Sequence, residues 1–219
     1  MSKTNINKFS CAILDLDGTL LDSTDLWHSI DLEFLGRRGI EPPADYLEDI
    51  KTFNFENGAK YTVKRFGLKE DYRDLMKEWF DMAVHAYANT IELKPHVKEF
   101  LEYLKKSGLT ICAATSSDES LYDACLKRNG IHHYFKNFTM TKEVEQDKGE
   151  PDVYLLAAEK NRAKVSDCIV FEDIISAAKG AKKGGFYTVG VFDKGSKDAI
   201  GRLKEVCDDY IHDFEELIR

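Results

Sequence analysis

Four short apolar runs, each followed by a polar residue, constrain most strongly how this chain can fold. They are residues 9–14, 109–114, 168–171 and 187–192, and the polar residues after them are Asp15, Thr115, Glu172 and Asp193. Uninterrupted apolar runs of this length are typical of strands that are buried on both faces of a parallel sheet. Helical patterns lie between the runs, for example at residues 97–107 and 152–160. This alternation predicts an α/β fold with a doubly wound, Rossmann-like parallel sheet.

The alternation is interrupted between the first and second runs. Residues 26–38 and 71–88 have helical patterns, and no convincing buried strand lies near them. We therefore expect a helical domain, residues 23–91, to be inserted into an α/β core domain that consists of residues 1–22 and 92–219.

The charge balance and the cysteine pattern narrow the partners and the compartment. Lys and Arg total 31 against 39 Asp and Glu, the net charge is −8, and no long basic stretch points to nucleic acid or an anionic membrane. No apolar run reaches the roughly 20 residues of a membrane-spanning helix, and the amino-terminal run is too short for a signal peptide. The 5 cysteines form no C-x-x-C pair, which favours free thiols in a reducing compartment. We therefore expect a cytoplasmic protein.

Two carboxylates follow the first predicted strand. In a doubly wound sheet, ligands bind beyond the carboxyl ends of the strands. Asp15 and Asp17 are two residues apart in an extended segment, so their side chains point the same way. They repel each other unless a cation lies between them or one is protonated. The pair therefore indicates either a functional site or an acidic turn, and Gly18 permits the turn in both cases.

Three further segments carry candidate groups. The hydroxyls and backbone N–H groups of Thr115, Ser116 and Ser117 could hold a phosphate oxygen at a helix N-terminus. Alternatively, this segment could simply cap the helix that starts near Glu119, and Asp118 could also serve as that cap. Lys148 could neutralise a phosphate or be a solvated surface lysine. Glu172 and Asp173 supply the oxygen ligands that Mg²⁺ prefers, although Asp173 could instead cap the next helix.

Taken in order, these segments resemble the haloacid dehalogenase-like superfamily. The matching stretches are DLDGTLLDS at 15–23, ICAATSS at 111–117, KGEPDVY at 148–154 and CIVFEDIISAAKGAKKGGF at 168–186. The helical insertion resembles the α-helical cap of the β-phosphoglucomutase-like phosphatases.

The resemblance implies a role for each acidic residue. Asp15 would attack phosphorus and form an aspartyl-phosphate. Asp17 would protonate the leaving alcohol and then take a proton from the attacking water. Asp173, the Asp15 carboxylate and the Asp17 backbone carbonyl would hold Mg²⁺, with Glu172 in a direct or supporting role.

The resemblance also implies a reaction class. Thr115, Ser116 and Lys148 would bind the transferring phosphoryl group, and Asp17 favours phosphate chemistry over dehalogenation. We expect a Mg²⁺-dependent phosphatase for a small phosphate ester of the sugar or polyol class, with a cap that closes over the site. Two alternatives stay open: a sugar-phosphate mutase of the β-phosphoglucomutase type, and a non-catalytic phosphate-binding regulatory protein.

Overall fold

The chain divides into two compact units. The computed structural model describes residues 3–50 and 53–218. Within them, the division falls after Thr24 and after Thr90, where the sequence analysis placed boundaries after residues 22 and 91. The part up to Thr24 together with the part from Ile91 is called the core unit, and Asp25–Thr90 is called the helical unit.

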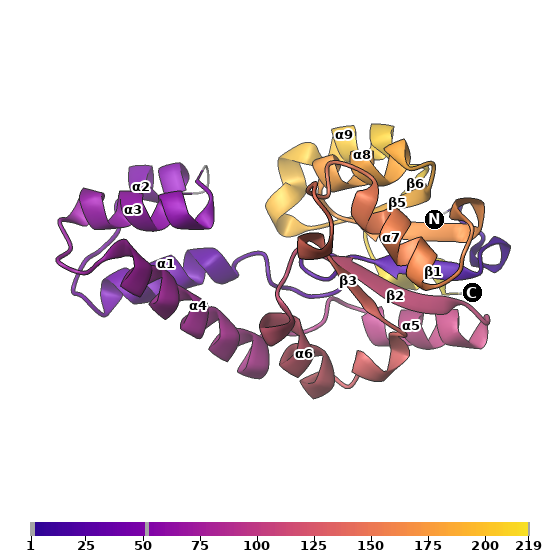
Figure 1. Ribbon diagram of the computed structural model, residues 1–219, viewed down its shortest axis with the longest axis horizontal. Helices are drawn as coiled ribbons and strands as arrows, with labels where there is room; N and C mark the ends of the chain where they lie inside the picture. Colours follow the sequence, from indigo (N-terminus) through magenta and orange to yellow (C-terminus); the bar gives the residue numbers. More distant parts are fainter. Residues whose placement is uncertain (1–2, 51–52, 219) are drawn as a thin grey trace. The chain divides into compact units, whose positions relative to one another are not determined.

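The core unit is built on one parallel sheet (Figure 1). Across the described residues it has six strands in the order β3-β2-β1-β4-β5-β6, and all neighbours are parallel. The strands are β1 (Cys11–Leu14), β2 (Thr110–Thr115), β3 (Phe138–Met140), β4 (Cys168–Glu172), β5 (Tyr187–Val191) and β6 (Asp209–Ile211). The chain runs outward from β1 in both directions, so the predicted doubly wound α/β fold is confirmed.

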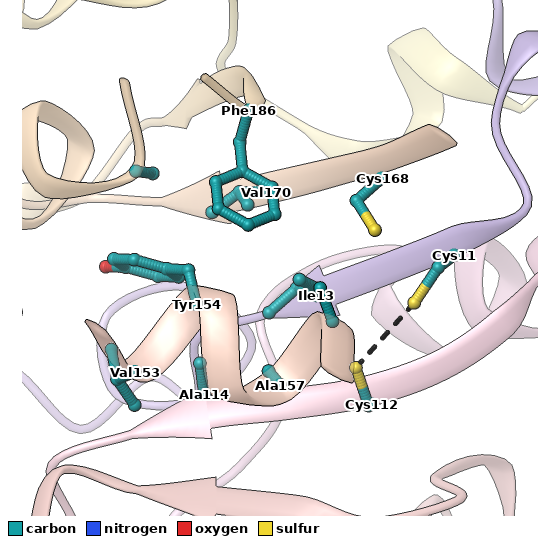
Figure 2. Close-up of a cluster of buried hydrophobic side chains, with 12 residues drawn as sticks. Cys11, Ile13, Cys112, Ala114, Val153, Tyr154, Ala157, Cys168, Val170 and Phe186 are labelled. Atoms are coloured by element: carbon teal, nitrogen blue, oxygen red, sulfur yellow. Dashed lines mark hydrogen bonds between the residues drawn. The ribbon is translucent and has the colours of Figure 1, made fainter. Parts of the chain in front are cut away.

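Helices cover both faces of this sheet (Figure 1). They are α5 (Val97–Lys106), α6 (Glu119–Arg128), α7 (Asp152–Lys160), α8 (Ile175–Lys183) and α9 (Ile200–Val206). On one face, α7 and α8 bury a cluster that includes Tyr154, Ala181 and Val170 (Figure 2). On the other face, Phe100 of α5 packs against Phe171 of β4, with ring centroids 5.2 Å apart. Val170 and Phe171 are adjacent in one strand and point to opposite buried faces, which is why the strand is apolar from Cys168 to Phe171.

Three of the cysteines belong to the first cluster. Cys11, Cys112 and Cys168 are buried there, and the Sγ atoms of Cys11 and Cys112 are 3.9 Å apart (Figure 2). All five cysteines are free. The neighbouring Cys112 and burial raise the pKa of Cys11 to about 12, so its thiol stays protonated and packs as a small apolar group.

The helical unit is a bundle with a core of its own. Its helices are α1 (Leu26–Gly36), α2 (Ala44–Ile50), α3 (Phe55–Phe66) and α4 (Tyr72–Asn89). The Asn54 side chain caps α3, Gly67 ends it in the left-handed conformation, and Asp71 caps α4. Phe34 of α1 packs edge-on against Trp79 of α4, with centroids 5.8 Å apart. Of the helices described in either unit, none has the length and apolar character needed to cross a membrane.

Two linkers join the helical unit to the core. Inside the core unit they run antiparallel, because Leu21 of the outgoing linker bridges to Leu93 of the returning one. The Asp22 N–H donates to the Glu92 carbonyl at 3.0 Å, and the Lys94 N–H donates to the Leu20 carbonyl at 2.9 Å. The outgoing linker begins four residues after Asp17, so its path bears directly on the site described next.

Candidate active site

The carboxyl ends of the central strands bring the sequence-predicted residues together. In the sheet register, Leu14 of β1 lies opposite Ala113 of β2 and Phe171 of β4. The residues that follow these positions therefore meet at one edge of the sheet. Asp15 comes directly after β1, and Asp173 directly after β4.

Three carboxylates, which we call the acidic group, converge at this edge. Asp15, Glu172 and Asp173 each place one carboxylate oxygen within 4.8 Å of the others. The three residues are only 7%, 1% and 4% exposed. Such a dense group of buried acids requires a compensating positive charge.

Lys148 supplies part of that charge. Its Nζ lies 2.5 Å from Asp15 Oδ1 and 2.5 Å from Glu172 Oε1. The Tyr154 hydroxyl also donates to Glu172 Oε1, at 2.7 Å. Lys148 stands in the loop before α7, and Gly180 of α8 lets this loop pass, because a Cβ at Gly180 would overlap the Lys148 carbonyl oxygen.

Burial raises the pKa values of all three carboxyl groups. The pKa of Glu172 rises to about 7, and those of Asp15 and Asp173 also rise above the ordinary value of an aspartate. Burial alone would lower the pKa of Lys148, but the charges of Asp15 and Glu172 raise it above its ordinary value. One charged lysine against three carboxylates leaves negative charge that a bound cation would offset.

The residues present fit a hard divalent cation. Three carboxylates offer oxygen ligands close enough to share one ion, and Mg²⁺ binds through one or two carboxylates together with water and substrate phosphate. The donor set contains only oxygen, which does not suit zinc or copper.

The turn after β1 packs closely against Asp173. Gly18 has a φ of 78°, and a Cβ there would overlap Asp173 Oδ2. Thr19 Oγ1 donates to Asp173 Oδ1 at 3.0 Å. Only glycine allows this approach, so the Gly18 predicted to permit a turn also seats the third carboxylate.

The Asp17 carboxylate is held by two hydroxyl groups and is not one of the three grouped carboxylates. Ser23 Oγ donates to Asp17 Oδ1 at 2.7 Å, and Ser117 Oγ donates to Asp17 Oδ2. The two hydroxyls orient the carboxylate from the outgoing linker and from the loop after β2. A metal contact of Asp17 through its backbone carbonyl stays a prediction.

The loop after β2 does not use Thr115 as the helix cap. Asp118 caps α6 by accepting a bond from the Ser120 N–H. Thr115 is buried, and its Oγ1 accepts from the Ser117 N–H at 3.0 Å, which leaves its own O–H for another acceptor. Ser116 is exposed. Phosphate binding by Thr115 and Ser116 stays a prediction.

The capping alternative for Asp173 is not observed either. Ile174 occupies the N-cap of α8, and this cap makes no side-chain hydrogen bond. The Asp173 side chain instead accepts from Thr19. Asp173 is therefore engaged with the turn after β1 and not with the helix that follows it.

Sequence reasoning assigned no role to three residues that support the site. Thr19 bonds to Asp173, Ser23 to Asp17 and Tyr154 to Glu172. The Ser117 hydroxyl, considered above for phosphate, donates to Asp17 instead. All four stand inside the stretches that carry the family resemblance. That position is the signal that could have found them, but their partners depend on loop paths that spacing does not reveal.

Comparison with known proteins matches the chain over most of its length. A family model described as "Haloacid dehalogenase-like hydrolase" matches residues 12–191. A candidate phosphatase of Bacillus subtilis, YhcW, is 27% identical over 209 residues, which is 94% of this chain and 90% of that protein. A "Phosphorylated carbohydrates phosphatase" of Thermotoga maritima is 24% identical over 173 residues, 79% of this chain and 80% of that one.

A solved structure also shares the fold. The crystal structure of a candidate β-phosphoglucomutase from Thermotoga maritima superposes with a TM-score of 0.85 at 22% identity. The superposition covers 96% of this chain and 97% of that chain.

Proposed function

Because the chain belongs to the haloacid dehalogenase-like hydrolases and is a phosphatase, we propose that it hydrolyses the phosphate monoester of a small sugar or polyol phosphate. The observation that carries this proposal is Asp15, held beside Lys148 and two further carboxylates at the carboxyl edge of the sheet. The substrate class is supported by the relative named for phosphorylated carbohydrates.

In the first half of the proposed reaction, an Asp15 carboxylate oxygen attacks phosphorus. A bond forms between that oxygen and phosphorus as the bond from phosphorus to the ester oxygen breaks. Asp17 gives its proton to the departing oxygen, so the alcohol leaves neutral. The hydroxyls of Ser23 and Ser117 hold the Asp17 carboxyl in a fixed orientation for this transfer.

In the second half, water attacks the phosphorus of the aspartyl-phosphate. The Asp17 carboxylate takes the proton of the water, and the bond between phosphorus and the Asp15 oxygen breaks. Inorganic phosphate leaves, and both aspartates return to their starting forms.

Positioning and charge neutralisation are most of what phosphoryl transfer requires. Lys148, with the Thr115 hydroxyl and Ser116, would bind the phosphoryl oxygens. Asp15, Asp173 and the Asp17 backbone carbonyl would hold Mg²⁺, with Glu172 as a direct or supporting ligand. When bound, Mg²⁺ offsets the negative charge of the phosphoryl group against the carboxylates. The contact of Glu172 with both Lys148 and Tyr154 favours the supporting role.

The nucleophile assignment is tested with Asp15→Asn. We expect Mg²⁺-dependent release of phosphate from an aryl phosphate to fall by at least about a thousandfold, because the amide cannot form the acyl phosphate. Asp123→Asn, which neutralises a carboxylate paired with Lys127 on α6, is the charge-matched control and keeps wild-type turnover. Full activity of Asp15→Asn would refute the assignment.

Two further measurements test the rest of the proposal. Removal of divalent cations with a chelator is expected to abolish turnover, and added Mg²⁺ is expected to restore it and to raise the melting temperature of the protein. Incubation with a hexose 1-phosphate separates hydrolase from mutase: free phosphate supports the hydrolase, and a 6-phosphate supports the mutase. The proposed location of the protein is the cytoplasm. The five free cysteines are compatible with that location.

A further inference from the structure

A largely buried lysine outside the group of Asp15, Glu172 and Asp173 contacts the turn that carries Asp17. Lys94 Nζ donates to the Gly18 carbonyl and, at 2.6 Å, to the Phe192 carbonyl. It also lies 2.9 Å from Asp193 Oδ2, and these two side chains are only 12% and 1% exposed. One ammonium group therefore ties the turn after β1 to the segment after β5.

The other oxygen of Asp193 holds the outgoing linker. Asp193 Oδ1 accepts from Thr24 Oγ1 at 2.8 Å and from the Gly195 N–H at 2.8 Å. Gly195 approaches Thr24 so closely that a Cβ at this position would overlap Thr24 Cγ2. The segment 192–195 is thus bonded to both linkers, to the outgoing one at Thr24 and to the returning one at Lys94.

Burying such an ion pair is a poor way to gain stability. The cost of taking both charges out of water usually matches or exceeds their attraction, and an apolar pair of similar volume is often as stable. A buried ion pair is better explained when it holds a segment of backbone in one position. Here Lys94 holds the backbone at Gly18, which packs against Asp173 and directly follows Asp17 in the chain.

We propose that Lys94 is a positioning residue for the phosphatase reaction. With Asp193 and Thr24, it holds the turn of residues 17–19 where Asp17 and Asp173 are aligned for phosphoryl transfer. This inference rests on the proposed function. Among the described residues, no hydrogen bond joins Lys94 to Asp15, Glu172 or Asp173, so its structural contact with the site is the hydrogen bond to the Gly18 carbonyl.

The main test is Lys94→Met, which keeps the length of the side chain and removes its charge and donors. Because misplacement by about 1 Å can cost on the order of a hundredfold, we expect kcat to fall by about tenfold to a hundredfold. KM is expected to change by less than about threefold, because Thr115, Ser116 and Lys148 remain in place. Lys94→Arg keeps the charge and the donors and is expected to recover part of kcat.

A second lysine–aspartate pair supplies the matched control. Lys182 Nζ lies 2.6 Å from Asp208 Oδ2 and donates to the Phe186 carbonyl at 3.4 Å. This pair stands where β5 and β6 begin, at the sheet edge opposite the acidic group. Lys182→Met is expected to keep kcat within about twofold of wild type, even where its melting temperature falls as far as that of Lys94→Met.

A glycine substitution tests the contact between the segment 192–195 and the outgoing linker without changing a charge. Gly195→Ala places a methyl group against Thr24 and is expected to lower kcat in the same range as Lys94→Met. Gly201→Ala is its control, because nothing lies within 4 Å of a Cβ at Gly201. If Lys94→Met does not fold, this pair decides the question.

The outcomes separate the inference from the proposed function. A wild-type protein without phosphatase turnover would overturn the proposed function and this role together. An active wild type in which both Lys94→Met and Gly195→Ala keep kcat within about twofold would overturn the positioning role alone. A loss of kcat in Lys182→Met equal to that in Lys94→Met would assign the effect to stability and also overturn it.

Discussion

Two effects, backbone strain and steric overlap, act together at Gly18. Its φ of 78° disfavours any residue with a Cβ, and that Cβ would also overlap the Asp173 carboxylate. We expect Gly18→Ala to lose about 1 kcal/mol of unfolding free energy or more and at least about a hundredfold in kcat, because the carboxylate must move. Thermal unfolding and initial rates measure the two losses.

Gly108 provides the comparison for strain alone. It has a φ of 81° at the end of α5, and nothing lies within 4 Å of a Cβ there. Gly108→Ala is expected to lose stability on the same scale as Gly18→Ala and to keep its kcat. Equal turnover of the two variants would show that the contact between Gly18 and Asp173 has no part in the reaction.

The positions of the three carboxylates could be predicted from the sequence, whereas the hydroxyl groups that bond to Asp17 could not. Asp15, Glu172 and Asp173 end or follow strands of a parallel sheet, and the sheet alone forces such residues to one edge. Ser23 and Ser117 reach Asp17 only because a linker and a loop bend toward it. Loop paths depend on long-range packing, so no local pattern indicates those bonds. The catalytic roles of these residues stay predictions, and Asp15→Asn tests that of the nucleophile.

At the scale of elements, three helices of the helical unit meet at a buried carboxyl group. Asp31 of α1 is 7% exposed, and its Oδ1 accepts from the Tyr46 hydroxyl of α2 at 3.3 Å. The same hydroxyl lies 2.9 Å from Thr62 Oγ1 of α3. Burial raises the pKa of Asp31 from 3.8 to about 6, against the opposing effect of the Tyr46 hydrogen bond.

This raised pKa sets the direction of a pH effect on stability. Between the unfolded value of 3.8 and the native value of about 6, the native state binds more protons than the unfolded state. Stability therefore falls as the pH rises through this window and stays lower above it, by on the order of 2–3 kcal/mol at most. Asp31→Asn removes the ionisation and is expected to be more stable than wild type at pH 7 and nearly equal to it at pH 4.

Tryptophan fluorescence can follow this effect in the helical unit alone. The 2 tryptophans, Trp27 and Trp79, both belong to that unit. Denaturant titrations at several pH values, read by fluorescence, give the unfolding free energy of each variant. Glu41→Gln, at an exposed position between α1 and α2, is the control and should track wild type at every pH. A stability difference between Asp31→Asn and wild type that does not change with pH would contradict the prediction.

The strands that could be predicted from the sequence are those with a run of at least four apolar residues. The runs that became β1, β2, β4 and β5 are apolar because both faces of these strands are covered. The edge strands β3 and β6 have only three residues each and were not predicted. A segment of that length carries no periodicity, and its pairing is decided by the neighbouring strand. The short helix α2 was missed for the same reason.

At the scale of the whole molecule, every residue of the candidate site belongs to the core unit. The helical unit is connected to it through two linkers that pair with each other inside the core, through Leu21 with Leu93 and Asp22 with Glu92. Their ends are therefore close enough for a short turn to join them. The cap role of the helical unit is a proposal that this geometry allows to be tested directly.

The test is a core-only variant in which Thr24 is joined to Ile91 by a Gly-Ser-Gly turn. We expect it to fold, because the sheet, its covering helices and the paired linkers all remain. It should hydrolyse a small aryl phosphate with Mg²⁺, since Asp15, Asp17 and Lys148 are retained, but discriminate poorly among sugar phosphates, because a cap selects substrates and excludes water. Circular dichroism checks the fold, and Asp15→Asn in the same background checks that the turnover belongs to this site. A folded core-only variant without turnover would show that residues 25–90 supply a group essential to the reaction.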